Sequence, residues 1–383
     1  MEPFLSPPVV LGLIGFLGAF YAYFGYPAAL LLWARVGPRP VDWSGEFTPS
    51  VSILLPVHNE EKTLRARLEN LDQLDYPRDR LEVIVVSDGS TDSTMSIARE
   101  FAEQVKWLSV LELPEQSGKA GALNRALSEA RNEIVVFTDA GILVATDSLR
   151  ALAAPFESPH IGCVSGEDHV AGGGGEALYG RYELFLRTQE SRVASIVGAS
   201  GSYYAQRRVL CASFPEGVAP DFLSVLRTVD AGYRSVTEPG ARGVMRATTS
   251  HGREFRRKVR TLVRGMTGLF AHAHLLNPLR SGSYAFVLFS HKLMRWFVPF
   301  FLLVMLGSHL ALLSSGWFRV LAVPHLGFYL AGFVGLVKVP WLRDQLPVRV
   351  ATYFITVNAA ILVAWWKYLG GTRQEIWRPT VRA

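Results

Sequence analysis

Three short apolar stretches in the first half of the chain run into an acidic residue: Ile-Leu-Leu-Pro-Val-His-Asn-Glu (53–60), Val-Ile-Val-Val-Ser-Asp-Gly (83–89) and Ile-Val-Val-Phe-Thr-Asp-Ala (134–140). Short runs rich in Val and Ile, separated by helical patterns, are typical of buried parallel strands. Ligands bind beyond the carboxyl ends of such strands. We therefore expect Glu60, Asp88 and Asp139 to converge on one crevice. Clustered carboxylates repel each other unless a cation or hydrogen-bond donors offset them, so the cluster indicates a site for a metal and a polar, nucleotide-like ligand.

The spacing between these strands predicts an α/β fold with a doubly wound, mostly parallel sheet. Leucines recur at helical spacing between residues 61 and 74, and a second strand is expected to begin at Leu81. Residues 87–94 resemble a turn that leads into a helix start, where free backbone N–H groups favour an anion or a polar ligand. A third strand is predicted at 106–111, followed by a helix that reaches Ala130.

Apolar runs at both ends of the chain predict membrane-spanning helices. Residues 9–33 are long enough to span and are followed by Arg35 and Arg39, and no basic segment precedes them as in a cleaved signal peptide, so we expect a retained anchor. Three further spans are predicted at 297–314, 320–341 and 348–366. The chain then carries one anchor before a soluble body and about three spans after it.

Basic residues at the edges of these runs predict the orientation. The soluble body is cytoplasmic if the first helix runs from outside to inside, because one set of basic residues then falls on one side: Arg35, Arg39, Lys292, Arg295, Lys338 and Arg343. Three C-terminal spans place Lys367, Arg373, Arg378 and Arg382 outside, against that rule. Either the tail is an exception or one apolar run is re-entrant or interfacial.

Charge and residue content exclude some classes of function. A net charge of +6 suits a protein on anionic lipid, and no basic face interleaved with aromatics predicts nucleic-acid binding. Cys163 and Cys211 form no CxxC pair and are expected to be buried thiols. The nine histidines make no zinc-type cluster. The glycine run at 170–176 lacks the spacing of a dinucleotide-binding loop and is expected to be a flexible loop.

The order of motifs resembles the membrane-bound family 2 glycosyltransferases, of the group that contains cellulose, chitin, hyaluronan and poly-N-acetylglucosamine synthases. The resemblance covers roughly residues 51–296. It rests on a collinear set: Pro-Val-His-Asn-Glu (56–60), Val-Ser-Asp-Gly-Ser-Thr-Asp (86–92), Gly-Lys-Ala-Gly-Ala-Leu-Asn (118–124), Phe-Thr-Asp-Ala (137–140), Gly-Ala-Ser-Gly-Ser (198–202), Pro-Asp-Phe (220–222), Gly-Tyr-Arg-Ser-Val-Thr-Glu-Pro-Gly-Ala (232–241) and Arg-Arg-Lys-Val-Arg-Thr-Leu-Val-Arg-Gly (256–265).

The resemblance implies a GT-A-like domain inserted between transmembrane helices. With it, the chain divides into an N-terminal anchor (1–36), a linker (37–50), the GT-A domain (51–250), an amphipathic interface region (251–283), C-terminal transmembrane helices (284–369) and a tail (370–383).

The resemblance also implies how a nucleotide sugar is held. Glu60 and Asp88 match the acids that bind the uridine, and Lys119 matches a lysine near the nucleotide. Carboxylates suit ribose hydroxyls and base N–H donors, and a lysine offsets phosphate charge. The alternatives are a helix cap or turn residue for the two acids and a solvated loop lysine for Lys119.

Asp139 matches the first acid of the DxD element that holds Mg²⁺ or Mn²⁺ against the diphosphate. Hard oxygen ligands suit these ions, and the metal bridges the leaving phosphates. Gly141 stands where the family has the second acid. The ion would then depend more on water and phosphate oxygens.

Asp221 matches the general base of the family, which must lie within hydrogen-bond reach of the acceptor hydroxyl. Pro220 replaces the usual acidic neighbour. The alternatives are Asp230 or Glu216 as the base, or a helix-capping role for Asp221. The small residues Gly198, Ser200, Gly201 and Ser202 resemble the stretch that approaches the acceptor.

An arginine-rich segment is amphipathic at helical spacing. Arg253, Arg257, Arg260 and Arg264 fall on one face, and the opposite face is apolar (Phe255, Val259, Leu262, Met266 and Phe270). Such a helix lies on a membrane surface with its apolar side in lipid or against the spans. Its arginines either attract headgroups or stabilise the diphosphate leaving group. The resemblance favours the second role, although Thr261 stands where processive synthases carry tryptophan.

Together these features predict an inverting glycosyltransferase of the cell membrane. It would move a sugar from a nucleotide sugar, expected to be a UDP-sugar, to a hydroxyl of a polysaccharide or of a lipid-linked glycan. About three C-terminal spans would form only a narrow channel for a growing polysaccharide. The enzyme could therefore add a single sugar, form a homo-oligomer or depend on an export partner. A catalytically inactive scaffold or nucleotide sensor is the alternative of another class.

Overall fold

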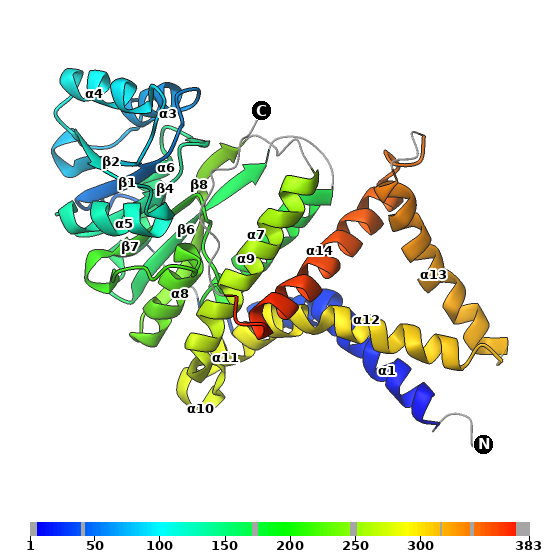
Figure 1. The fold of residues 1–383 in the computed structure, drawn as a ribbon. Coiled ribbons are helices and arrows are strands. Elements are labelled where there is room, and N and C mark those ends of the chain that lie inside the picture. The colour runs from blue at the N-terminus through cyan, green and yellow to red at the C-terminus, as the bar shows by residue number, and fades with distance from the viewer. Residues whose placement is uncertain are drawn as a thin grey trace.

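The computed structural model describes residues 6–39, 43–170, 175–245, 251–314, 316–337 and 341–372. The glycine run at 171–174, residues 373–383 of the predicted tail and Lys338 lie outside these ranges. A domain built on one sheet lies beside a set of long apolar helices, with α7 and α9 between the two parts (Figure 1).

The sheet contains eight strands in the order β3-β2-β1-β4-β7-β6-β8-β5. Their bounds are β1 Val51–Val57, β2 Leu81–Asp88, β3 Leu108–Leu113, β4 Ile134–Thr138, β5 Ile142–Val144, β6 Ile161–Val170, β7 Tyr203–Arg207 and β8 Arg234–Met245. β1 to β4 pair in parallel, as predicted. β7 runs antiparallel to both β4 and β6, and β5 runs antiparallel to β8, so the second half of the sheet is mixed.

Helices cover both faces of this sheet because the strands are apolar on both sides. In β1, Ile53 and Leu55 pack into one core with α3 and α4, whereas Leu54 packs into another core with α5 and α8. A strand buried on both faces reads as a continuous apolar run, which is what the sequence shows at 51–57. The helices of the domain are α3 Leu64–Asp72, η3 Arg78–Arg80, α4 Thr94–Gln104, α5 Gly118–Glu129, α6 Ser148–Ala153, η4 Ala154–Glu157, α7 Gly175–Val193, η5 Arg208–Leu210 and α8 Pro220–Asp230.

Among the described residues, four helices are long and apolar enough to cross a membrane: Pro7–Val36, Ser283–Ala311, Arg319–Leu336 and Leu346–Leu369. The first comprises α1 Pro7–Phe20, the π-helical turn η2 Tyr21–Gly25 and α2 Tyr26–Val36. The chain returns to the apolar helices through α9 His251–Ala271, η6 Ala273–Leu276 and α10 Pro278–Ser281. It continues as α11 Ser283–Leu288, η7 Phe289–Leu293, α12 Met294–Ala311, α13 Gly316–Leu336 and α14 Leu346–Leu369.

The apolar helices form two pairs. α1 lies along α12, where Gly15 and Gly18 leave room for the backbone and ring of Phe301, and α13 lies beside α14 (Figure 1). A third core joins these helices to the sheet domain. It contains Tyr26 of α2, Phe222 of α8, Met266 of α9 and Ala364 of α14. The sheet domain therefore packs directly on the apolar helices that the sequence assigns to the membrane.

Candidate functional site

The three predicted acids lie at the ends of neighbouring parallel strands. β2, β1 and β4 are neighbours and parallel, with Val57 opposite Ser87 and Leu54 opposite Phe137. The turns that follow the three strands therefore leave the sheet at the same edge. Glu60, Asp88 and Asp139 all lie there.

Asn59 joins the first two of these turns. Its backbone has a φ of +53°, which is uncommon for a residue other than glycine and occurs often at functional sites. Its N–H donates to Ser90 Oγ at 3.2 Å, and its Oδ1 accepts the Thr91 N–H at 2.8 Å. The next N–H, that of Glu60, donates to Thr94 Oγ1 at 2.7 Å. Hydrogen bonds thus link the turn after β1 to the turn after β2. Asn59 belongs to a motif that the sequence analysis identified, but its role in this link was not predicted.

Asp88 is fully buried and acts on the start of α5. Its Oδ1 accepts the Ser117 N–H at 2.6 Å and the Ser117 hydroxyl at 3.0 Å, and its Oδ2 accepts the Gly118 N–H at 2.9 Å. The structure thus shows the helix-start role that the sequence left open as the alternative for this acid. Through these bonds Asp88 positions the turn that carries Lys119.

Lys119 and Asp139 lie together, although they come from different elements. Lys119 Nζ is 2.5 Å from Asp139 Oδ1 and 3.1 Å from the Gly201 carbonyl oxygen. Lys119 is at the start of α5, and Asp139 follows β4 with its side chain 37% exposed. The lysine partly neutralises an acid that stays accessible, which suits an edge that receives a charged ligand.

Asp221 joins this group from α8. A small cavity is lined by Lys119, Thr138, Gly201 and Asp221, and a Cβ built on Gly201 would lie 3.6 Å from Asp221 Oδ2. Pro220 and Asp221 occupy the first turn of α8, where the helix dipole favours a negative charge. Burial raises the pKa of the Asp221 carboxyl above its ordinary value, and the charge of Lys119 opposes that rise. A carboxylate of raised pKa is better matched to proton abstraction than an ordinary one.

The Gly-Ala-Ser-Gly-Ser stretch divides into two parts with different roles. Ser200 is buried, and its hydroxyl accepts the N–H groups of Ser202 and Tyr203 at 3.2 and 3.1 Å. Ser202 is buried as well, and its carbonyl oxygen accepts from Thr138. The serines therefore hold the turn, whereas Gly198 and Gly201 provide space beside α8.

Asp139 is the residue at this edge that could bind a metal ion. In the part of the chain that the structure describes, no three His, Cys, Asp or Glu side chains come together. A magnesium-type ion commonly uses one or two protein carboxylates and completes its shell with water and substrate phosphates. Asp139 fits an ion of that kind, delivered with a diphosphate.

The arginine-rich segment forms α9, as predicted. Val259, Val263, Met266 and Leu269 are buried against the core that also contains α14, so the apolar side faces a candidate span. Arg257 lines a cavity between α9 and the apolar helices, and Arg260 and Arg264 are half-buried. The side chain of Arg253 lies outside the described residues.

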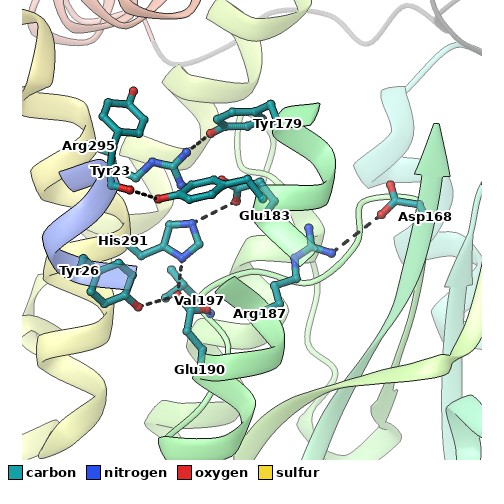
Figure 2. Close-up of polar contacts among 11 residues, drawn as sticks. Tyr23, Tyr26, Asp168, Tyr179, Glu183, Arg187, Glu190, Val197, His291 and Arg295 are labelled. Atoms are coloured by element: carbon teal, nitrogen blue, oxygen red, sulfur yellow. Dashed lines mark hydrogen bonds and ion pairs between the residues drawn. The ribbon is translucent and has the colours of Figure 1, made fainter. Parts of the chain in front are cut away.

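A buried ionic network that we did not predict lies between α7 and the apolar helices (Figure 2). His291 of η7 contacts two carboxylates, Glu190 Oε1 at 2.5 Å and Glu183 Oε2 at 3.1 Å. Arg295 pairs with Glu183 Oε1 at 2.5 Å and donates to the Tyr179 hydroxyl. Tyr26 donates to Glu190 at 2.7 Å. Ionisable residues in an apolar helix are costly, so Glu183 and Glu190, seven residues apart on α7, compensate His291 and Arg295.

This network corrects one step of the orientation argument. We counted Arg295 among the basic residues that flank a span, but its side chain is only 7% exposed and is neutralised by Glu183. It therefore adds no charge to the membrane surface. Within the described residues, Arg35, Arg39 and Arg343 remain as surface cations of that set.

The fold and the edge of the sheet define a GT-A-like domain, and comparison with known proteins shows which family this part of the chain matches. Residues 52–208 match the model of glycosyl transferase family 2. The chain therefore carries a family 2 glycosyltransferase domain and joins it to helices long and apolar enough to cross a membrane.

Two curated relatives are similar to parts of the chain. The beta-monoglucosyldiacylglycerol synthase of Nostoc sp. is 37% identical over 125 residues, which cover 32% of this chain and 27% of the relative. The poly-beta-1,6-N-acetyl-D-glucosamine synthase of Staphylococcus epidermidis is 27% identical over 194 residues, covering 50% of this chain and 43% of the relative. The chain thus matches less than half the length of either protein.

One solved structure is similar over almost the whole chain. The mannosyltransferase PcManGT from Pyrobaculum calidifontis, in complex with GDP-Man and Mn²⁺, has a TM-score of 0.73 and 27% sequence identity. The similarity covers 94% of this chain and 98% of that one. It therefore includes the apolar helices as well as the sheet domain.

Proposed function

We propose that the chain is an inverting glycosyltransferase that moves a sugar from a nucleotide sugar to a hydroxyl of a membrane-bound acceptor, a polysaccharide or a lipid-linked glycan. The observation that carries the proposal is the meeting of Lys119, Asp139 and Asp221 at the carboxyl edge of the sheet, from three separate elements. It is supported by the family 2 domain and by the similarity to a mannosyltransferase.

The roles follow from the chemistry of each group. Asp221 takes the proton of the acceptor hydroxyl, whose oxygen attacks the anomeric carbon as the bond from that carbon to the diphosphate breaks. The nucleoside diphosphate leaves with the bonding electrons, and the configuration at the anomeric carbon inverts. Lys119 faces the diphosphate, and arginines of α9 (Arg257, Arg260 or Arg264) add positive charge as negative charge develops there. Glu60 faces the nucleoside, and Asp88 supports the same subsite, chiefly through the turn that it holds.

A divalent cation, Mg²⁺ or Mn²⁺, would be held by Asp139 and the donor phosphates, and it would neutralise the leaving group. When the donor binds, Lys119 exchanges its contact with Asp139 for one with phosphate. The PcManGT structure contains Mn²⁺, which supports this assignment for a related chain.

We further propose that the chain lies in the cell membrane with its catalytic domain on the cytoplasmic side. The four apolar helices and the basic residues Arg35, Arg39 and Arg343 support this placement.

The test is release of nucleoside diphosphate by the chain purified in lipid nanodiscs, with panels of UDP- and GDP-sugars, each with Mg²⁺, Mn²⁺ or EDTA. We expect one donor to be hydrolysed or transferred only with metal, and Asp139→Asn to lose that metal response. Asp79→Asn, an exposed acid on another edge, serves as the matched control. If wild type releases no nucleoside diphosphate from any donor, the scaffold alternative replaces this proposal.

A further inference from the structure

A cavity of about 310 Å³ lies where α9 meets the apolar helices. Three of the four candidate spans contribute to its wall: Tyr23 comes from the first, Trp296 from the second and Ile361 from the last. A volume near 300 Å³ is at the lower end of the range of small-molecule sites. The cavity therefore lies at the boundary between the sheet domain and the membrane helices.

The polar part of this cavity is cationic. Its wall contains Arg257, Lys258 and Lys292, together with Arg295, whose charge Glu183 neutralises, and no carboxylate occurs among the described residues that line it. Arg295 is held from behind by Glu183, and Lys258 Nζ lies 2.9 Å from the Tyr353 hydroxyl oxygen. Arginine and lysine side chains together with a tyrosine hydroxyl are donors that suit phosphate oxygens.

The remaining wall is apolar and belongs largely to candidate spans. Leu262 of α9 faces Trp296 of α12 and Val357 and Ile361 of α14 across the same cavity. A ligand with one anionic group and one hydrocarbon chain satisfies both parts of the wall, whereas a free sugar carries neither an anion nor a hydrocarbon chain. The lining thus favours an amphiphile of the membrane.

Lys292 connects this cavity with the site of the proposed base. Its Nζ lies 5.6 Å from the centre of the Phe222 ring, and Phe222 follows Asp221 in α8. A Cβ built on Gly198 would lie 4.0 Å from Lys292 Nζ and 3.6 Å from the same ring. Gly198 therefore lies between Lys292 of this cavity and Phe222 of α8.

We infer that this cavity binds the phosphate of a lipid-linked acceptor, whose sugar extends past Gly198 and presents its hydroxyl to Asp221. The inference rests on the proposed function and names its acceptor class: a glycan carried by a lipid phosphate or diphosphate. A sugar hydroxyl must lose a proton when it attacks, whereas a phosphate oxygen need not. An acceptor that reacts through a sugar hydroxyl therefore explains why a base is present.

Binding is tested first, with farnesyl diphosphate as the probe and farnesol and inorganic diphosphate as its two halves. In nanodiscs of zwitterionic lipid, we expect the wild type to bind farnesyl diphosphate at least tenfold more tightly than either half. Lys258→Met and Lys292→Met should each reduce that preference about fivefold to twentyfold, and Lys292→Arg should restore it. Arg35→Met removes a cation at the end of another candidate span and should leave binding unchanged.

Transfer distinguishes this inference from the proposed function. Two acceptors with the same sugar are compared, one linked to farnesyl phosphate and one a dodecyl glycoside. We expect the Lys258→Met and Lys292→Met variants to lose rate with the phosphate-linked acceptor only. Equal use of both acceptors by wild type, or weaker nucleotide binding by these variants, overturns the inference while leaving the transferase activity in place. A loss of binding in Arg35→Met as well would mark general attraction to anionic lipid and would also overturn it.

Discussion

Asp221 and Glu183 are both carboxylates withdrawn from water, yet their surroundings shift their pKa values in opposite directions. Burial raises the pKa of Asp221, and this rise is only partly opposed by the charge of Lys119, a backbone hydrogen bond and the charges of Lys292 and Arg187. Burial acts the same way on Glu183, but Arg295 and His291 outweigh it and hold the pKa of Glu183 well below its ordinary value. The carboxyl at the proposed site of proton transfer is thus only partly compensated for its burial, whereas the carboxyl in the structural network is fully compensated.

The two regions also differ in what they connect. At the edge of the sheet, Lys119 and Asp221 line a small cavity, and Lys119 also contacts Asp139. The network joins α7 of the sheet domain to η7 and α12 with direct bonds between charged side chains. Removing a charge should therefore cost activity in the first region and stability in the second.

The largest effect is expected for Asp221→Asn. Loss of the general base should lower the transfer rate roughly 10²–10⁴-fold, measured as release of nucleoside diphosphate with saturating donor and acceptor. The stability of this variant should not fall at neutral pH. An acid whose pKa is raised in the folded state contributes stability below its ordinary pKa of 3.8. It loses that contribution as the pH rises through its pKa in the folded state. At neutral pH the neutral Asn variant should therefore be equally or slightly more stable. A variant that stays fully active would show that another group is the base.

The opposite result is expected for Glu183→Gln, which leaves Arg295 facing an uncharged partner, whereas His291 keeps its contact with Glu190. Breaking a buried ion pair on one side costs about 3–5 kcal/mol of unfolding free energy, measured by chemical denaturation in detergent. The double variant Glu183→Gln/Arg295→Met should recover part of that loss because no buried charge remains unpaired.

An exposed ion pair provides the control for this experiment. Arg65 and Glu100 lie 2.7 Å apart, with side chains 47% and 55% exposed. Glu100→Gln should cost less than about 1 kcal/mol. An equal loss in Glu100→Gln and Glu183→Gln would contradict the structural role of the buried network.

The sequence predicted the first half of the fold well because that half is locally encoded. β1 begins at Val51, β2 at Leu81 and β4 at Ile134, as the apolar runs indicated. The acids at the ends of β1, β2 and β4 were predicted to share one edge because the carboxyl ends of parallel strands meet there. The antiparallel β7 was not predicted, since a strand inserted between β4 and β6 depends on long-range pairing that no local pattern records.

The site was predicted in part for the same reason. Asp139 and Asp221 were found from motifs, and the structure brings both next to Lys119. The bonds from Asp88 to Ser117 and Gly118 could not be read from the motif, because 29 and 30 residues separate these partners in the chain. Glu183 and Glu190 carried only a weak signal, a seven-residue spacing on one helix. The sequence places Arg295 among the charges that flank a span, because it does not show that Glu183 lies opposite, and it gives His291 no role.

Asp88→Asn should produce a smaller loss at the functional edge. The asparagine amide has a single, uncharged accepting oxygen, so it cannot replace the carboxylate as acceptor for both Ser117 and Gly118. Hydrogen bonds to charged groups contribute about 1.5–3 kcal/mol each. We expect a lower melting temperature and a KM for the donor raised severalfold, with a smaller change in kcat, because the turn carrying Lys119 is loosened. An unchanged melting temperature with a lost donor affinity would show instead that Asp88 acts mainly as a ligand of the nucleotide.

The smallest effect is expected for Lys119→Met, which should displace the pH profile of kcat. This displacement tests most directly how the surroundings set the pKa of Asp221. Because the base must be ionised, transfer should fall as the pH drops through the pKa of Asp221, which lies above 3.8. Lys119 lowers that pKa, so Lys119→Met should move the acid limb of kcat to higher pH at saturating donor. Lys106→Met, on the loop before β3, provides a matched loss of charge and should leave the limb in place. If Lys119→Met changes the rate at every pH by the same factor, the lysine acts on the donor alone, and the pKa of Asp221 is set by burial without its help.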